Sequence, residues 1–159
     1  MSDRGTSVRL TPDEAWAELE RSHTGILTTL RRDGMPIALP VWFVVLDRTI
    51  CLAVPSRTKK VTRIRNDPRA SFLVESGERW VELRAVHLTG RMEVVVDAAT
   101  QSRIDDDLAG KYAAFRTPGS VMPQRTQQHY ADRTFLRLVP DGRILSWDNS
   151  RLELAEEAE

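Results

Sequence analysis

The amino-acid sequence predicts a single, mainly β domain with flanking helices, in which six or seven strands form a closed antiparallel barrel. Three observations lead to this expectation. Short apolar runs of strand length follow one another from about residue 25 to residue 147, and turn signals such as Asp33-Gly34 separate them. Helical patterns are few. No repeat or linker interrupts the 159 residues, so one domain should span residues 1–159.

Turn signals and apolar periodicity place the elements in order. Thr11-Pro12-Asp13-Glu14 starts the first helix, because it combines an N-cap, a proline at the first helical position and a capping-box glutamate. Ala15, Trp16 and Leu19 would form the buried face of this helix. The other helices are expected at 58–67 and 97–115, with a loop at 117–126. The predicted strands cover residues 25–30, 35–46, 49–54, 69–75, 79–95, 133–139 and, after a turn at 140–142, 143–147.

Two of these strands carry irregular features. Pro36 and Pro40 lie in the second strand, and proline has no N–H for a sheet ladder, so they should face an edge, a bulge or a ligand. In the strand at 79–95 the apolar positions change from odd to even numbers, which predicts a β-bulge near Ala85-Val86. Gly90 indicates a tight bend or the close approach of another backbone.

The composition excludes several classes of function. Basic and acidic residues balance at 23 each, so the chain lacks the general attraction to phosphate on which nucleic-acid binding depends. Its one cysteine, Cys51, allows neither an intramolecular disulfide nor a cysteine metal cage, and its position in a strand indicates a buried thiol. No segment has the length of a membrane span or the pattern of a secretory leader. We expect a cytoplasmic protein that binds neither nucleic acid nor membrane, with frayed ends at 1–8 and 150–159.

The most informative segment is a basic cluster at the start of the second helix. Its five basic residues fall within nine positions, with no acid before Asp67; they are Arg57, Lys59, Lys60, Arg63 and Arg65. A helix N-terminus already carries partial positive charge, so this cluster is unfavourable unless an anion lies there. Thr58 adds a hydroxyl suited to capping or to a phosphate oxygen. A solvated basic face is the alternative, but the helix start after an apolar strand favours a phosphate site.

Other polar groups give weaker indications. The three histidines are widely spaced and no nucleophile–base arrangement stands out, so we expect neither a metal ion nor a catalytic side chain. His129, Tyr130 and Asp148 are the candidates for a hidden proton donor. The acids at 105–107 are expected to form a solvated face. Trp42 is either a core residue or a packing partner for a ring cofactor.

The order of the motifs is itself characteristic over about residues 10–150. The motifs are Gly25-Ile26-Leu27-Thr28-Thr29, Asp33-Gly34-Met35-Pro36, Pro40-Val41-Trp42-Phe43, Thr58-Lys59-Lys60, Asn66-Asp67-Pro68-Arg69, Leu88-Thr89-Gly90, Leu138-Val139-Pro140 and Ser146-Trp147-Asp148. This order resembles the pyridoxamine 5′-phosphate oxidase-like split β-barrel superfamily, and within it the flavin- and deazaflavin-dependent oxidoreductases. The resemblance implies a six-stranded antiparallel split β-barrel that forms a homodimer, with two cofactors in grooves between the subunits.

The resemblance also implies a set of cofactor-binding residues, with four roles. Thr58, Lys59 and Lys60 would hold the cofactor phosphate, and Arg57 would add countercharge. The strand Pro40, Val41, Trp42 and Phe43 would run along the cofactor ring, Ala53, Val54 and Pro55 would flank the ribityl chain, and Trp80 and Trp147 would approach the ring from the partner subunit.

The chain departs from pyridoxamine 5′-phosphate oxidase proper at two places. It has Thr58-Lys59-Lys60 where that enzyme has Ser-Arg-Lys, and the stretch at 143–147 lacks the Arg-x-His substrate motif. These differences argue against vitamin B6 oxidation. The looser phosphate helix and the Pro40-Val41-Trp42-Phe43 strand favour the branch that binds coenzyme F420, whose phospholactyl-polyglutamate tail is strongly anionic. The resemblance then implies an F420H2-dependent oxidoreductase that transfers a hydride from the reduced deazaflavin to an unsaturated or carbonyl-conjugated organic substrate. An FMN enzyme of the same fold and a non-catalytic F420 carrier remain open alternatives.

Overall fold

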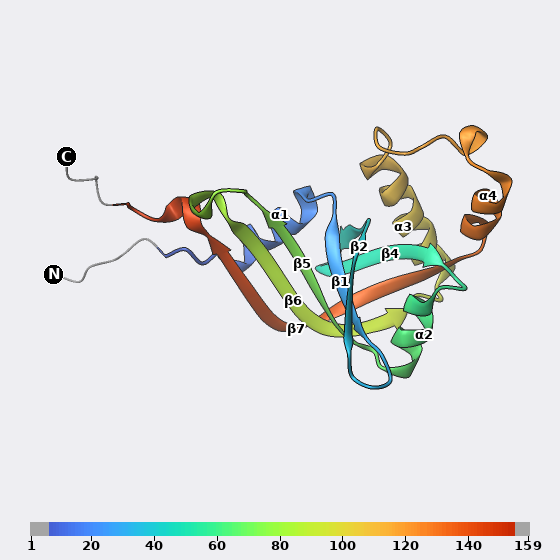
Figure 1. Ribbon diagram of the computed structural model, residues 1–159, viewed down its shortest axis with the longest axis horizontal. Helices are drawn as coiled ribbons and strands as arrows, with labels where there is room; N and C mark the ends of the chain where they lie inside the picture. Colours follow the sequence, from blue (N-terminus) through green and yellow to red (C-terminus); the bar gives the residue numbers. More distant parts are fainter. Residues whose placement is uncertain (1–6, 155–159) are drawn as a thin grey trace.

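The computed structural model describes residues 7–154, in which a strongly curled antiparallel sheet is surrounded by helices (Figure 1). The seven strands are β1 (Gly25–Leu30), β2 (Pro36–Val41), β3 (Val44–Leu46), β4 (Thr49–Pro55), β5 (Arg69–Ser76), β6 (Arg84–Val94) and β7 (Arg133–Asp148). The four α-helices of the described part are α1 (Pro12–Arg21), α2 (Lys59–Asn66), α3 (Ala98–Lys111) and α4 (Gln124–Ala131), and three short 3-10 helices are η1 (Trp80–Glu82), η2 (Gly119–Val121) and η3 (Asn149–Arg151).

The sheet curls because its two edge strands are neighbours in the sequence. The strand order is β2-β1-β5-β6-β7-β4-β3, and only Trp42 and Phe43 separate the end of β2 from the start of β3. Three Cα–Cα steps span at most about 11 Å, so the opposite edges must lie close together. The expected strand at 35–46 is therefore two strands, and the described sheet has seven strands where the resemblance implied six. The edge strands β2 and β3 form no ladder with each other, so the expected closed barrel is a curled half-barrel in the described chain. Pro36 and Pro40 lie on the edge strand β2, as one of the alternatives predicted.

The long strands β6 and β7 contain the main irregularity of the sheet. Leu88 pairs with Ile144 and Gly90 with Pro140, so one residue of β6 lies opposite three residues of β7. This bulge absorbs the Pro-Asp-Gly sequence at 140–142, and the prediction of a turn between two strands there is wrong because β7 runs on without a break. A Cβ on Gly90 would lie 2.2 Å from the Val139 carbonyl oxygen, which confirms the predicted close approach.

The predicted bulge at Ala85-Val86 is wrong. Both residues pair in regular register with β5 and with β7. The odd-numbered apolar residues that produced the phase change, Val81 and Leu83, lie in η1 and directly after it, before β6 begins. The change of phase therefore marks a boundary between two kinds of structure.

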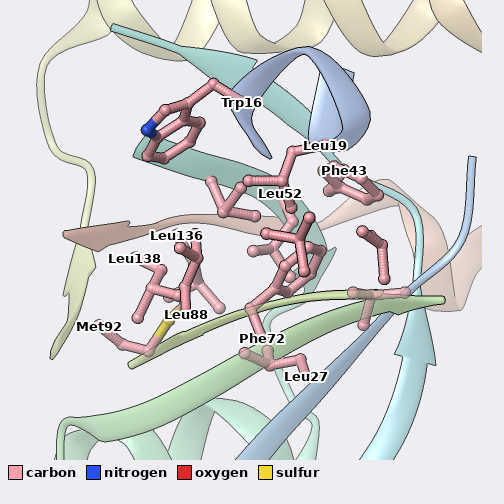
Figure 2. Close-up of a cluster of buried hydrophobic side chains, with 14 of the residues drawn as sticks. Trp16, Leu19, Leu27, Phe43, Leu52, Phe72, Leu88, Met92, Leu136 and Leu138 are labelled. Carbon is pink, nitrogen blue, oxygen red and sulfur yellow. The ribbon is translucent and has the colours of Figure 1, made fainter. Parts of the chain in front are cut away.

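The main core fills the concave side of the sheet. Figure 2 shows Trp16 and Leu19 of α1 facing the inner side chains of the sheet, among them Phe43, Leu52 and Leu88. The burial of α1 was predicted, and so was its start. Thr11 accepts from the Glu14 N–H, and the Glu14 carboxylate accepts from the Thr11 N–H at 2.7 Å. From α2, Val61 and Ile64 join the same core.

A second core lies on the outer side of β3 and β4, beneath α3. Its buried members are Val44, Leu46, Cys51, Val95, Ile104, Leu108 and Tyr112. Phe43 points into the main core and its neighbour Val44 into the second, so the alternation of a strand continues where the chain passes from β2 to β3. Cys51 is buried as predicted, and burial raises the pKa of its thiol.

The remaining differences from expectation lie in polar segments. The loop predicted at 117–126 contains η2 and the start of α4, a helix with no buried residue and hence no apolar periodicity to reveal it. The third helix ends at Lys111, before residue 115. Of the expected tails, residues 1–6 and 155–159 lie outside the described residues. In the described parts, Asp148 N donates to Val8 O at 2.8 Å and Arg151 forms an ion pair with Glu14. None of the helices in residues 7–154 has both the length and the hydrophobicity of a membrane span.

Candidate functional site

The turn that leads from β4 into α2 is held against the start of β7. Ser56 N donates to Asp132 O at 3.0 Å, and the Ser56 hydroxyl donates to the Asp132 carboxylate at 3.1 Å. The Thr134 hydroxyl donates in turn to Ser56 Oγ at 2.9 Å. These contacts fix the position at which α2 begins, because the turn is tied to a strand of the main sheet.

The N-terminus of α2 is not capped by its own side chains. Thr58 is the N-cap residue, with extended backbone, but its side chain makes no capping bond and the first turn contains no acid. Its Oγ1 is buried and has no hydrogen-bond partner within residues 7–154. A buried hydroxyl without a partner costs about 1–3 kcal/mol. The free N–H groups of the first turn and this hydroxyl together offer donors to an anion.

Lys60 and Arg63 extend the positive charge along the half-buried side of α2. Burial lowers the pKa of Lys60, and the charge of Arg63 lowers that pKa further. Arg63 is oriented by its Nε, which donates to the hydroxyl of the buried Thr29 on β1 at 2.8 Å. The lysine is thus held where its charged form is disfavoured. A nearby anion would lower the free energy of that charged form.

The basic cluster of α2 is not neutralised by the rest of the described chain. Arg57, Lys59 and Arg65 are exposed. None of the ion pairs within residues 7–154 involves any of the five cations of the cluster. By contrast, Arg84, Arg133 and Arg151 are each paired with a carboxylate. The cluster therefore has unused charge at the place where the helix N-terminus already favours an anion.

The predicted ring-binding strand, residues 40–43, divides between the core and the surface. Val41 and Phe43 are buried in the main core, so their side chains are inaccessible, and the backbone N–H and C=O of Phe43 contact the buried Tyr112 hydroxyl. Pro40 is exposed, and Trp42 is 43% exposed. One face of the Trp42 indole stacks on Tyr112, with ring centroids 4.4 Å apart and an interplanar angle of 8°.

The end of β4 leads into the turn before α2. Val44 of β3 pairs with Cys51, and Ala53 pairs with Phe135 of β7. Val54 is buried in the main core, whereas Ala53 and Pro55 are half-buried. The chain therefore joins the segments at 53–55 and 57–60 at the end of β4. Pro40 and Val41 pair with Ile26 and Gly25 at the start of β1, whereas Arg63 of α2 contacts Thr29 near the other end of that strand. That residues 40–43 and α2 share one site stays a prediction.

Trp80 and Trp147 lie elsewhere in the same chain. Both are partly exposed, Trp80 in η1 and Trp147 opposite Ala85 near the C-terminal end of β7. Pro55, next to the α2 site, pairs with the other end of β7 at Arg133. Figure 1 shows α2 and α4 at one end of the sheet and the C-terminal end of β7 at the other. A role for these two tryptophans at the site therefore needs a second chain, and stays a prediction.

The other candidate groups take structural or exposed positions. His129 and Tyr130 are exposed on α4. Asp148 is buried, with its pKa lowered by hydrogen bonds from Ser150 and by the charges of Arg84 and Arg151, so it is held as a carboxylate. Asp105, within the acidic run, pairs with Arg133 at 2.7 Å. Within residues 7–154 no three His, Cys, Asp or Glu side chains form a group that could hold a metal ion.

Tyr112 is a buried residue of the site region to which the sequence patterns assigned no role. This residue is fully buried, and its hydroxyl contacts the backbone of Phe43. A signal was available, because Ile104, Leu108 and Tyr112 follow one another at the four-residue spacing of a buried helix face. Its neighbour Lys111 places a buried Nζ 4.0 Å from the centroid of the Phe43 ring, and burial lowers the pKa of this lysine to about 8.

Comparison with solved structures shows that the fold recurs in other proteins. A conserved hypothetical protein from Mycobacterium tuberculosis is 28% identical with a TM-score of 0.79, over 100% of this chain and 97% of that chain. A FAD-binding protein from Mesorhizobium loti is 20% identical with a TM-score of 0.66, over 86% of this chain and 91% of its own. An F420 reductase is 22% identical with a TM-score of 0.64, over 85% of this chain and 98% of its own. No curated protein matches the sequence.

The family is established by the sequence. Residues 11–144 match the family model described as pyridoxamine 5′-phosphate oxidase, a span that runs from the N-cap of α1 into the second half of β7. It includes the crossover at residues 42–43, the end of β4 and all of α2. The match confirms the resemblance inferred from the order of the motifs: the chain belongs to the pyridoxamine 5′-phosphate oxidase family.

Proposed function

We propose that this protein is an F420H2-dependent oxidoreductase, which reduces an unsaturated or carbonyl-conjugated organic substrate. The observation that carries the proposal is the N-terminus of α2, where uncapped N–H groups, the unpartnered Thr58 hydroxyl and an unneutralised basic cluster meet. A phosphate would accept hydrogen bonds from these donors and compensate the charge. The family, and an F420 reductase among the proteins that share the fold, support this proposal.

Each part of the site has a proposed role. Thr58 and the first N–H groups of α2 donate to the cofactor phosphate, with Lys59 and Lys60 as countercharge. The exposed Arg57 and Arg65, which have no carboxylate partner in the described chain, bind the further anionic groups that distinguish F420 from FMN. When bound, the reduced deazaflavin supplies the hydride. The residues of this chain bind it, orient its ring along residues 40–43 and exclude water.

A homodimer would complete this site. The described chain places Trp80 and Trp147 far from α2, so they contribute only if they come from a second copy, as the resemblance implies. The prediction is a particle of about twice the chain mass of 18.1 kDa in light scattering. A monomer that still binds the cofactor would remove the two tryptophans from the site.

A flavin cofactor is the second candidate, and the family match favours it directly. The family model is that of pyridoxamine 5′-phosphate oxidase, and a FAD-binding protein shares the fold. The phosphate site at α2 suits either cofactor, because both carry a phosphate on a ribityl-type chain. A third candidate is a carrier that binds F420 without turnover.

A fluorescence titration separates these candidates. We expect the purified protein to bind F420 more tightly than FMN or FAD. The opposite order would replace the deazaflavin with a flavin, and the absence of binding to any of the three would overturn the cofactor proposal. Turnover with an artificial electron acceptor then distinguishes an oxidoreductase from a carrier, which would bind the reduced cofactor but leave it reduced.

A further inference from the structure

Tyr112 joins three backbone groups at the crossover between the two edges of the sheet. Its hydroxyl accepts a hydrogen bond from Phe43 N at 2.9 Å. It also lies 2.8 Å from Phe43 O and 2.7 Å from His23 O, so its single proton is shared between these two carbonyls. Through this one side chain, α3 holds both the crossover and the segment between α1 and β1.

The ring of Tyr112 holds the other residue of the crossover. The Trp42 indole stacks on it at 4.4 Å and nearly parallel, while the His23 ring meets it edge-on at 6.0 Å. Tyr112 is fully buried, whereas Trp42 is 43% exposed. The indole is therefore held on one face by a buried ring while the residue as a whole stays 43% exposed, which suits a platform for a flat ligand.

The same end of α3 also contacts the side chain of Phe43. Lys111 Nζ lies 4.0 Å from the centroid of the Phe43 ring, and the ring packs edge-on against Phe72 in the core. The backbone of Phe43 is bonded to Tyr112, and its side chain is enclosed between Lys111 and the core. Neither residue of the crossover can then rotate without breaking contacts to α3.

We infer that Tyr112 is a positioning residue, which sets the orientation of the Trp42 indole as a platform for the cofactor ring. The identity of the ligand in this inference rests on the proposed function. The geometry of the platform is independent of that proposal. Tyr112 acts through Trp42 and touches no reacting atom. Its hydroxyl matters because it fixes the backbone that carries the indole.

The first test compares the two tyrosines of the chain. Tyr112→Phe keeps the ring and removes the hydroxyl, and Tyr130→Phe is the matched control on the exposed face of α4. With F420 as the probe, we expect Tyr112→Phe to weaken binding roughly tenfold, if the released indole keeps the binding orientation about a tenth of the time. Tyr130→Phe should bind as the wild type does. Equal affinities in two folded variants would overturn the inference.

A double-mutant cycle distinguishes positioning from a general loss of structure. If Tyr112 acts through Trp42, then Tyr112→Phe should have little further effect on F420 affinity once Trp42→Ala has removed the platform. A tenfold loss that persists in the Trp42→Ala background would show that Tyr112 acts by another route and would overturn the inference.

Two readouts remain if the cofactor proposal fails or Tyr112→Phe does not fold. The first readout is the quenching of tryptophan fluorescence by acrylamide, measured without any cofactor, with the share of Trp42 obtained by comparison with Trp42→Phe. This quenching of Trp42 should increase in Tyr112→Phe. Unchanged quenching would overturn the inference even if no cofactor binds. In folded Tyr130→Phe protein labelled with 3-fluorotyrosine, only Tyr112 carries fluorine. Its ¹⁹F resonance should shift when F420 binds, and an unmoved resonance in protein that binds F420 would equally overturn it.

Discussion

The helices α1 and α2 both begin with a threonine, and the two N-termini are built in opposite ways. At α1, Thr11 and Glu14 form a reciprocal capping box, Pro12 occupies the first turn and two acids complement the helix dipole. At α2, Thr58 makes no capping bond, its hydroxyl is buried without a partner in residues 7–154, and the charged residues of the first turn are basic. The same residue type thus stabilises one helix and leaves the other with unsatisfied donors.

The difference indicates what each helix start is for. A capping box is complete within the chain, so α1 needs no ligand. The N-terminus of α2 lacks these stabilising contacts, and its donors can be satisfied only by a group that residues 7–154 do not supply. Such a local cost persists where function requires it. Substitutions at the start of α1 or of α2 test this difference.

The largest expected effect is on ligand binding at α2. Lys60→Glu should weaken F420 binding at least roughly tenfold, because a charge-assisted phosphate contact is worth about 1.5–3 kcal/mol and reversal adds repulsion. The same variant should not lower the stability of the cofactor-free protein, because an acid in the first turn complements the dipole. Fluorescence titration and urea unfolding measure the two quantities.

Arg9→Glu provides the control for that charge reversal. Arg9 is exposed and lies before α1, away from the basic cluster. An equal loss of affinity in Lys60→Glu and Arg9→Glu would mean that only the total charge matters, and the phosphate assignment would fail.

The second prediction concerns the hydroxyl of Thr58. Thr58→Val keeps the shape of the side chain and removes the unpartnered oxygen, so the stability of the cofactor-free protein should stay the same or rise by up to about 1 kcal/mol. Affinity for F420 should fall about tenfold, because a donor to the phosphate is lost. A loss of stability in the absence of cofactor would show that the hydroxyl has a partner within the protein.

The third prediction concerns the hydroxyl of Thr11, where the outcome should be reversed. Thr11→Ala should destabilise the protein by about 1 kcal/mol, which lowers the melting temperature by about 2–4 °C for a chain of this size. Cofactor affinity should not change. Thermal unfolding of Thr11→Ala and of Thr58→Val tests the contrast between the two helix starts directly. An equal fall in melting temperature in both variants would contradict that contrast.

The smallest expected effect is a difference in pH dependence. Hydrogen bonds from Arg151 and from the Thr11 N–H lower the pKa of Glu14 to about 2, from an ordinary value of 4.5. Stability from this carboxylate is present above pH 4.5 and is lost as the pH falls toward 2. Lys60 acts in the same direction but in the alkaline range, because burial lowers its pKa and the folded state gains stability as the pH rises from that pKa toward 10.5. Urea unfolding at several pH values measures both effects. The free energy of unfolding should fall less in acid for Glu14→Gln than for the wild type, and should rise less in alkali for Lys60→Met.

Local signals in the sequence located both helix starts. The capping box at α1, the basic cluster at α2, the β1–β2 hairpin and the edge position of Pro36 and Pro40 all follow from residues within a few positions of one another. Capping, turn formation and the missing proline N–H are local effects, so a single chain segment suffices to predict them.

Several features of the candidate site depend on distant contacts. The break between β2 and β3 at Trp42 and Phe43 has no local turn signal, because the chain keeps a strand-like alternation while it crosses from one edge of the sheet to the other. Tyr112 contacts Phe43 from 69 positions away, and nothing near either residue announces that hydrogen bond. Likewise, β7 continues past Pro140 because the bulge against β6 accommodates it.

The sequence by itself determined the antiparallel β class, the family and the basic helix start that we propose as the phosphate site. Only the tertiary structure decided that the Thr58 hydroxyl is buried without a partner in the described chain, that Phe43 lies in the core and that Trp42 rests on Tyr112. The physical reason is that charge and capping chemistry belong to short segments of chain. Burial and stacking arise only when the sheet curls and α3 packs against the crossover, and they depend on residues that the local pattern does not contain.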